Sequence, residues 1–349
     1  MRVKLEDVCV RGSSNLKQSD VIDKTGEYPI YGAAGYIGNV DFYYQDQPYV
    51  AVVKDGAGIG RTSLYPAKSS VIGTMQYLLP KENVLPEYLC YVVKYMHLEK
   101  YFTGATIPHI YFKDYKKEEF NLDTLDRQKE IVNILGRIES VISSRQQELQ
   151  KLDELIKARF VELFGDPDNN EKSWDIDKME HLCEVGSSKR IYQNEQSMEG
   201  APFLRISDLV NRIDTGSKKC DSYIPIEKFA ELKEQGLVPR PGDILLTARG
   251  TLGRCYIVQS DDEFYFQDGM ITWLSNYDRR ITALYISYLF EMPGFRKQID
   301  ALQAGSTVAY MSISMTKKLN IIVPPIELQN QFADFVKQVD KSKVIKLSN

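Results

Sequence analysis

Residues 125–164 read LDRQKEIVNILGRIESVISSRQQELQKLDELIKARFVELF, and this stretch determines how the rest of the chain is organised. It contains no proline and one glycine, Gly136. Its apolar residues recur at alternating steps of four and three, with Arg145 and Arg159 at the two missing positions, which is the heptad pattern of a parallel or antiparallel coiled coil. The apolar positions are Ile131, Leu135, Ile138, Ile142, Leu149, Leu152, Ile156 and Leu163. The pattern predicts one helix of about 60 Å, stopped by the Gly-Asp-Pro sequence at 165–167.

The sequences on the two sides of this helix repeat each other. LEDVC at 5–9, followed by GSS at 12–14, returns as MEHLC at 179–183, followed by GSS at 186–188. Further matches follow in the same order: 58–61 with 251–254, 103–106 with 304–307, and 125–128 with 326–329. The separation between matches grows along the chain, so the second copy is longer in its middle. We infer a tandem duplication of a domain-sized unit.

Each copy has the pattern of an α+β domain with a twisted, mostly irregular sheet. Short runs rich in β-branched and aromatic residues, such as 49–53 and 243–247, predict strands. A helix is expected at 86–101 in the first copy and at 282–301 in the second. A last apolar strand is expected at 318–323.

The predicted fold class is therefore α+β, with two tandem homologous domains at 1–124 and 166–325. A long coiled-coil helix at 125–165 separates them. A second, shorter helix at 326–349 has room for only about 33 Å.

Composition narrows the class of protein further. The 349 residues are 43% hydrophobic and 26% charged, as in an ordinary globular chain. There is no apolar run of ~18 residues and no signal-peptide pattern at the start, so we expect no membrane span. Five scattered cysteines without a C-x-x-C pair predict free thiols in a reducing cytoplasm. A net charge of −4 excludes a wholly basic surface but allows a local basic groove.

Two related domains joined by a rigid helix would hold two related surfaces at a fixed distance. Duplex DNA presents equivalent groove faces every ~34 Å, so a fixed protein spacing selects a fixed spacing of base pairs. Because the two copies diverge outside their common framework, we expect them to read different sequences. The arrangement predicts an asymmetric, two-part site on double-stranded DNA.

The motifs resemble those of a known family. They are the two GSS turns, TGEYPIYG at 25–32, KDGAGIGR at 54–61, GATIPHI at 104–110, and PPIELQ at 324–329, which opens a helix. In this combination the sequence resembles the DNA-specificity (S) subunit of type I restriction-modification systems. The resemblance implies that each repeat is a target-recognition domain for one half of a bipartite site.

The resemblance also implies partners. Two methyltransferase (M) subunits dock on the spacer helices and methylate adenine, and motor-nuclease (R) subunits join for cleavage. S-adenosylmethionine, ATP and Mg are expected in those partners, and no catalytic residue, cofactor or metal is expected in this chain. The expected partner-binding residues are Ile131, Leu135, Ile138, Ile142, Leu149, Leu152 and Ile156. Through the same seam the isolated chain could pair with itself. The family's second helix is normally about as long as the first, and the shorter helix here departs from that pattern.

Candidate DNA contacts lie in the glycine turns. The loop at 56–62 lacks the spacing of a nucleotide-binding loop, which leaves a DNA-phosphate contact or a plain hairpin. The equivalent loop of the second copy, at 248–254, carries Arg249. This residue aligns with Asp55 or Lys54 and could contact guanine O6 and N7. Structural roles explain the remaining candidate positions equally well. These roles are a solvated loop, a helix-capping turn or, for His109, packing within the fold. The expected DNA-binding residues are Ser13, Ser14, Lys54, Arg61, Thr106, His109, Lys113, Lys189, Arg190, Arg205, Arg249, Arg254, Ser306, Thr307 and Tyr310.

Two other classes of function remain as alternatives. A scaffold protein would use the heptad helix for assembly and its paired domains to bind protein or carbohydrate. A stand-alone enzyme fits less well, because the acidic segment at 167–172 has the wrong spacing for a nuclease and no Asn-Pro-Pro-aromatic methyltransferase motif occurs. A local basic cleft would favour DNA binding over the scaffold.

Overall fold

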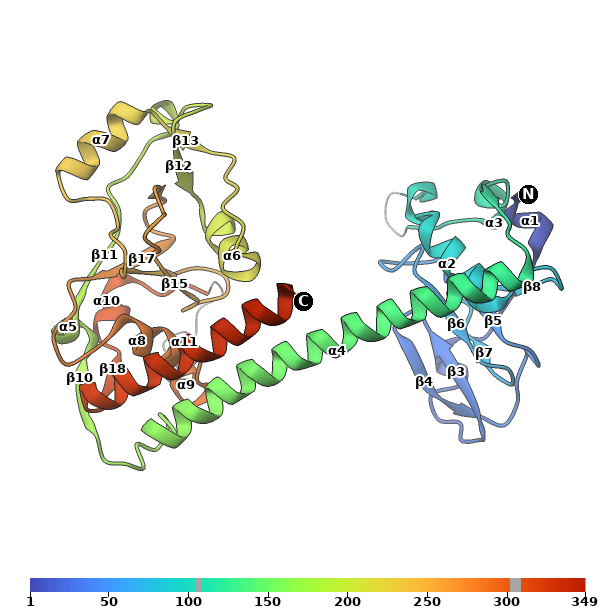
Figure 1. The fold of residues 1–349 in the computed structure, drawn as a ribbon, viewed down its shortest axis with the longest axis horizontal. Helices are drawn as coiled ribbons and strands as arrows, with labels where there is room; N and C mark the ends of the chain where they lie inside the picture. The colour runs from blue at the N-terminus through green and yellow to red at the C-terminus, as the bar shows by residue number, and fades with distance from the viewer. Residues whose placement is uncertain (105–107, 302–308, 349) are drawn as a thin grey trace. The chain divides into compact units, whose positions relative to one another are not determined.

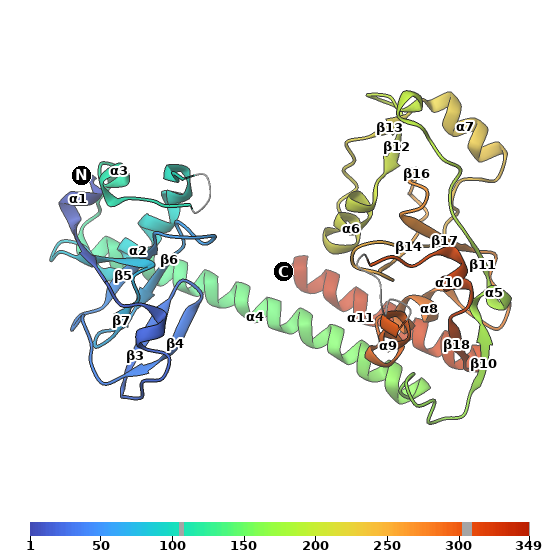
Figure 2. The same ribbon diagram turned by 180° about the vertical axis from the view of Figure 1, so that it is seen from behind.

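The computed structural model describes residues 1–104, 108–301 and 309–348, with side chains described up to Lys343. The chain divides into two compact units, Met1–Ser144 and Arg145–Asn349. The division falls inside the long helix α4 (Leu125–Phe164), which begins at the predicted residue and ends one residue before the expected limit at 165 (Figures 1 and 2).

The first unit contains three small sheets. An antiparallel four-stranded sheet has the order β2-β8-β5-β6, and a three-stranded sheet has the order β4-β3-β7, in which β3 is antiparallel to β4 and parallel to β7. Strands β1 and β9 form an antiparallel pair. The strands are β1 (Arg2–Lys4), β2 (Cys9–Ser13), β3 (Tyr28–Gly32), β4 (Gly35–Val40), β5 (Tyr49–Val53), β6 (Thr62–Tyr65), β7 (Ser70–Val71), β8 (Met75–Pro80) and β9 (Glu119–Asn121). The helices are α1 (Leu5–Val8), α2 (Pro86–Tyr95) and α3 (Phe112–Tyr115).

The second unit repeats this plan strand for strand. Its sheets have the orders β11-β17-β14-β15, β13-β12-β16 and β10-β18, and β12 is again antiparallel to one neighbour and parallel to the other. The strands are β10 (Asp175–Lys178), β11 (Glu184–Gly186), β12 (Ala201–Leu204), β13 (Tyr223–Ile224), β14 (Ile244–Thr247), β15 (Cys255–Ile257), β16 (Tyr265–Phe266), β17 (Ile271–Ser275) and β18 (Asn320–Val323). The helices are α5 (Met179–Leu182), α6 (Ile206–Thr215), α7 (Ile226–Glu234), α8 (Ala283–Leu289), α9 (Pro293–Ala301), α10 (Ile313–Lys317) and α11 (Ile326–Ser348).

The matching strand orders agree with the duplication inferred from the sequence. They also explain why the second copy is longer in its middle. In the first unit a tight hairpin joins β3 to β4, whereas in the second unit α6 lies between β12 and β13 and α7 follows β13. In Figures 1 and 2, α7 and α6 flank β12 and β13 on opposite sides.

Each end of α4 packs on the unit to which it belongs. At its N-terminal end Ile131 and Val132 pack on the first unit's core, and the buried Gln128 accepts a hydrogen bond from Leu85 N at 2.8 Å. At its C-terminal end the core residues are Ile156, Phe160, Leu163 and Phe164. Gly165, with φ +83°, then ends the helix in the left-handed conformation that glycine adopts without strain.

Helix α11 lies antiparallel beside the C-terminal half of α4, as both views show (Figures 1 and 2). Phe332 meets the Phe160 ring at 5.5 Å, whereas Lys343, eleven residues further along α11, pairs with Asp153 at 2.7 Å, seven residues earlier on α4. The heptad pattern allowed a parallel or an antiparallel partner, and the structure has the antiparallel one.

Two predicted helices are wrong in extent. The helix expected at 86–101 ends at Tyr95, because His97 has φ +51°, and a 3₁₀ turn follows. The helix expected at 282–301 is divided into α8 and α9, and Pro293 begins the second of these. Proline lacks an N–H and disfavours helical conformation in the residue before it, which accounts for the break.

The five cysteines are free thiols. Cys9 and Cys183 occupy the same place in the two copies and are buried, and burial raises the pKa of each thiol to about 12. Among the described residues, no helix combines the length and apolarity needed to cross a membrane.

Candidate nucleic-acid interface

One loop pair occurs in the same form in both units. In the first unit Lys54 N donates to Thr74 O and Lys54 O accepts from Ile110 N, both at 2.9 Å. In the second unit Ala248 N donates to Met270 O and Ala248 O accepts from Met311 N, also at 2.9 Å. The loop after β5 is therefore equivalent to the loop after β14, and each lies against the loop that precedes α3 or α10.

This match decides the alignment that the sequence left open. Asp55 forms a β-bridge with His109, and Arg249 forms the equivalent bridge with Tyr310. Arg249 is thus the counterpart of Asp55 and not of Lys54. The sequence analysis predicted His109, Arg249 and Tyr310 as contacts but missed Asp55, whose role depends on pairing across the fold.

The two equivalent positions carry opposite chemistry. His109 Nδ1 donates to the Asp55 carboxylate at 2.6 Å, and Lys54 Nζ lies 3.8 Å from the other carboxylate oxygen. In the second unit the Arg249 guanidinium lies over the Tyr310 ring at 5.6 Å. The first pair is centred on an anion and the second on a cation, and all four residues are partly or largely exposed.

A cationic pocket of about 750 Å³ opens around Arg249 in the second unit. It brings together Arg190, Arg205, Arg249 and Tyr310, which come from segments spread over 120 residues and were all predicted as DNA contacts. Asp268 compensates one of the guanidinium groups, because Arg190 Nε donates to it at 2.8 Å. The pocket therefore keeps a positive excess, which suits a polyanion.

The polar lining of this pocket includes side chains that the sequence analysis missed. Gln193, Gln196 and Gln267 lie there, and Arg205 donates to the Gln196 amide oxygen at 3.4 Å. Amide side chains carry both donors and acceptors, as base edges do. Nothing in their local sequence distinguishes them from other surface glutamines.

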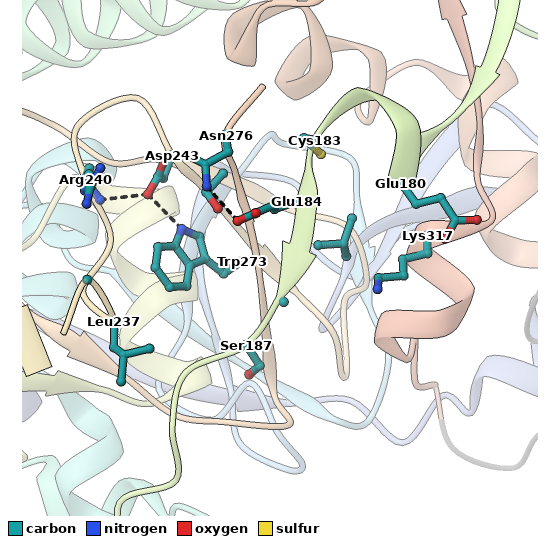
Figure 3. A pocket seen from close by; sticks show the side chains of 14 residues that line it. Glu180, Cys183, Glu184, Ser187, Leu237, Arg240, Asp243, Trp273, Asn276 and Lys317 are labelled. Carbon is teal, nitrogen blue, oxygen red and sulfur yellow. Dashed lines mark hydrogen bonds between the residues drawn. The ribbon is translucent and has the colours of Figure 1, made fainter. Parts of the chain in front are cut away.

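A second pocket in the same unit has a different character (Figure 3). It has a volume of about 500 Å³, and its charged residues are Glu180, Glu184 and Asp243 against Arg240 and Lys317. Burial raises the pKa of Asp243, although hydrogen bonds from Arg240 N and Trp273 Nε1 act in the opposite direction. With an acidic excess this pocket is a poor place for phosphates, so the pocket around Arg249 is the better candidate for a nucleic-acid surface.

Several predicted contacts lie elsewhere. Ser14 is only 3% exposed and its hydroxyl accepts from Leu16 N at 3.2 Å, so this side chain belongs to the turn and is not a surface contact. Ser13 stays exposed and accepts a hydrogen bond from Arg11. Lys113 and Lys189 are exposed, and Lys113 lies over the Tyr111 ring. Thr106, Ser306 and Thr307 fall outside the described residues.

Arg61 and Arg254 are also equivalent, but each is engaged differently. Arg61 donates to Ala33 O at 3.1 Å, next to the β3–β4 hairpin. Arg254 forms a hydrogen bond and ion pair with Asp214 of α6, and this hydrogen bond lowers the pKa of the Asp214 carboxyl. The inserted helix therefore compensates Arg254, and Arg254 is not part of the cationic pocket.

The predicted partner-binding seam of α4 is divided into three parts. Ile131 and Leu135 face α2 in the first unit, and Ile156 is buried in the core of the second, so Ile156 is not a surface for a partner. Leu149 and Leu152 are half-buried. Ile138 and Ile142 are 50% and 51% exposed. Only this middle part of the seam is open.

A groove of about 810 Å³ adjoins the open part of the seam in the first unit. It lies between α2 and α4 and is lined by Tyr88, Tyr91, Tyr95, Ile131 and Leu135, among others. Its apolar lining, next to the exposed Ile138 and Ile142, forms an apolar surface of the kind that proteins use for partners.

The second unit shows how the equivalent groove is filled. Tyr88 donates to Asn121 O, as Tyr285 does to Ile322 O, which makes α8 the counterpart of α2. There the groove between α8 and α11 holds the C-terminal end of α4, with Phe160 stacked on Tyr285 at 5.4 Å. The first unit presents the same groove without such a helix from its own residues.

Removing the two flanking arginines of the cationic pocket should weaken DNA binding in a salt-dependent way. We expect Arg190→Gln with Arg205→Gln to lower the slope of log affinity against log salt by up to about 1.8, since each phosphate contact contributes ~0.9. Fluorescence anisotropy on duplex DNA over a salt series measures this slope for the assembled complex. Arg279→Gln, which removes an exposed cation outside the pocket, is the control and should leave the slope unchanged. An unchanged slope in the double variant would contradict the assignment of the pocket.

No group of three or more His, Cys, Asp or Glu side chains is arranged to hold a metal ion within the ranges that the structure describes. The chain is thus built from two copies of one fold, and each copy presents a polar loop pair of its own chemistry.

Comparison with known proteins identifies the class. The family model for the type I restriction modification DNA specificity domain matches residues 1–154 and again residues 171–348. The chain belongs to this family, as its motifs predicted. It is a DNA-specificity subunit, a non-catalytic class of protein, and this decides against the scaffold and stand-alone enzyme alternatives.

Two relatives and one solved structure agree with this family assignment. A type I restriction enzyme specificity subunit of Haemophilus influenzae is 26% identical over 89% of this chain and 80% of its own length. The MjaVIII specificity subunit of Methanocaldococcus jannaschii is 23% identical over 85% of this chain and 73% of its own. The fold is similar to the S subunit of the M. genitalium type I system, with a TM-score of 0.60, 14% identity, and coverage of 100% of this chain and 91% of that one.

Proposed function

We propose that this subunit reads a bipartite, asymmetric site on double-stranded DNA, with each domain reading one half. The observation that carries the proposal is the equivalent loop pair with opposite chemistry: Asp55 and His109 in one unit, Arg249 and Tyr310 in the other. An identical framework supports binding of both domains to equivalent faces of a duplex. Different side chains on that framework support two different half-sites.

The subunit would direct the chemistry of its partners. Two methyltransferase subunits, supplied with S-adenosylmethionine, would modify adenines in the site, and motor-nuclease subunits using ATP and Mg would cleave unmodified DNA. In this proposal α4 acts as the spacer that fixes the gap between half-sites. Its unbroken run from Leu125 to Phe164 supports that role, since a continuous helix resists bending.

The proposal is tested by mapping methylated adenines in DNA from cells that express this chain with its cognate methyltransferase subunit. Single-molecule sequencing that detects modified bases should return a motif with two unlike halves and a constant gap. A symmetric motif would contradict asymmetric reading. Absence of methylation, with the same methyltransferase active beside another specificity subunit, would contradict the proposed function.

The open part of the α4 seam is the surface we propose for partner docking. We expect Ile138→Glu with Ile142→Glu to reduce assembly with the methyltransferase subunit at least ten-fold, because charges would replace apolar side chains that a partner would bury. Analytical ultracentrifugation of the mixed subunits measures the assembled fraction. It also shows whether the isolated chain pairs with itself through this surface.

Ser143→Glu adds a charge at an exposed polar position of the same helix and serves as the matched control. It should assemble as the parent does. If the double variant also assembles normally, partner docking does not use this part of α4.

A further inference from the structure

We propose that the equivalent positions 55/109 and 249/310 are the base-reading pair of each domain, with guanine read by Arg249 and an amino-bearing base, adenine or cytosine, read by Asp55 with His109. This inference rests on the proposed function and adds which chemistry each half-site presents. It assigns one specificity-determining pair of positions per domain.

The argument begins with equivalence of position. The main-chain hydrogen bonds that flank Asp55 and Arg249 match in both units: Gly56 N donates to Pro108 O, and Gly250 N donates to Ala309 O. Both residues therefore project from the same point of the same framework. Whatever surface of DNA one of them meets, the other meets in its own half-site.

The second step is the availability of the Arg249 guanidinium. Within the described residues Arg249 has no ion pair, whereas Arg190 is paired with Asp268 and Arg254 with Asp214. Its guanidinium lies over the face of the Tyr310 ring, and a guanidinium stacked in this way can still donate from the N–H groups at its edge. A free planar fork of donors matches guanine O6 and N7 in the major groove, and among the bases only guanine offers two acceptors there.

The third step is that the first unit presents a hydrogen-bond acceptor where the second unit presents donors. The Asp55 carboxylate accepts a hydrogen bond from His109 Nδ1 at 2.6 Å, and as an anion it carries further lone pairs and no donor. The first unit therefore presents an acceptor at the position where the second presents the donors of Arg249. Acceptors pair with the exocyclic amino groups of adenine N6 or cytosine N4, and they face unfavourable oxygen lone pairs at guanine O6 or thymine O4.

The other two arginines of the pocket have a different role in this proposal. Arg190 and Arg205 lie around Arg249 and can meet phosphates, which carry no base information. A base contact and a phosphate contact are distinguishable by experiment. Loss of a phosphate contact weakens all sequences equally and reduces the salt slope, whereas loss of a base contact relaxes preference at one position.

The test compares methylation motifs of the parent and variant complexes, each with its cognate methyltransferase subunit. Arg249→Gln should relax one guanine, or replace it by adenine, in one half-site, with discrimination at that position falling roughly 5- to 150-fold. Asp55→Asn should relax one adenine or cytosine in the other half-site. In each variant the unaffected half-site shows that the protein is folded and bound.

Three further variants keep the result decisive. Arg249→Lys retains the charge but not the planar fork, so it should lose guanine discrimination while keeping the salt slope. Arg279→Gln and Asp46→Asn, at exposed positions outside the loop pairs, should leave both half-sites unchanged.

Base analogues test contact directly. Replacing the assigned guanine by 7-deazaguanine removes the N7 acceptor and should weaken binding by the parent complex but not by the Arg249→Gln complex. If Arg249→Gln leaves both half-sites unchanged and lowers affinity for all sequences alike, Arg249 contacts phosphate and the inference fails. A parent complex without any bipartite motif would instead contradict the proposed function itself.

Discussion

Replacing Phe160 with alanine is expected to lower the free energy of unfolding of the Arg145–Asn349 unit by about 3–5 kcal/mol. The Phe160 side chain is fully buried. Its ring meets Phe164 at 4.8 Å, Tyr285 at 5.4 Å and Phe332 at 5.5 Å. These contacts join α4 to α8 and α11, so truncation would leave a cavity where three helices meet.

Chemical denaturation followed by tyrosine and tryptophan fluorescence measures this effect. Val161→Ala, at a neighbouring position of α4 that is 44% exposed, is the matched control and should change stability by less than 1 kcal/mol, roughly the worth of a partly exposed side chain. Equal denaturation midpoints for Phe160→Ala and the parent would show that the α4–α11 contact contributes little to the second unit.

The second large effect is expected at the buried ion pair of the second unit. Arg212 and Asp262 have side chains that are 4% and 0% exposed, and Arg212 Nη1 lies 3.1 Å from the Asp262 carboxylate. The Arg212 guanidinium also lies over the Phe264 ring at 4.9 Å. Asp262→Ala would leave the buried Arg212 cation without this carboxylate. We expect the free energy of unfolding to fall by about 3–5 kcal/mol.

Asp261→Ala is the control for this variant. Asp261 is 76% exposed and pairs with Lys218, as Asp262 also does. An exposed pair of this kind contributes about 0–1 kcal/mol. If Asp261→Ala and Asp262→Ala lower the free energy of unfolding equally, burial does not determine how much the Arg212–Asp262 pair contributes to stability.

The same ion pair predicts a pH dependence. Burial raises the pKa of the Asp262 carboxyl, but hydrogen bonds from Tyr256, Gln259 N and Lys218, with the charge of Arg212, lower it more, so that the net shift is downward. A carboxyl with a lowered pKa stabilises the fold above its unfolded pKa of ~3.9, and this contribution is lost as pH falls through the folded value. The stability difference between the parent and Asp262→Ala should therefore shrink below about pH 4. A difference that stays constant down to pH 2 would contradict this account.

The ion pair also relates to the proposed recognition surface. Arg212 belongs to α6, the helix inserted between β12 and β13, and α6 also carries Asp214, the partner of Arg254. The insertion that lengthens the second copy thus pairs with Arg254, whereas the equivalent Arg61 of the first copy donates to the main-chain oxygen of Ala33. Insertions of this kind are one way in which two copies of a domain acquire different surfaces.

The amino-acid sequence alone determined the features that depend on neighbouring residues. Helix α4 was predicted at 125–165 and is observed at Leu125–Phe164, because heptad spacing and the Gly-Asp-Pro stop are signals that act between near neighbours in the chain. The duplication and the family followed from motifs that recur in order, and strand β5 was predicted at its correct limits. Where local signals conflict, prediction failed: the second expected helix is broken at Pro293, and the first ends before the left-handed His97.

Only the tertiary structure decided which of the candidate residues act together. The pairing of Asp55 with His109 joins residues 54 positions apart, and one pocket gathers Arg190, Arg205 and Arg249 from separate segments of the chain. Ser14 and Ile156 share the sequence character of their exposed neighbours, yet both are buried. Such contacts form only when strands and helices pack, because burial depends on the elements that cover a residue and not on its own neighbours in the chain.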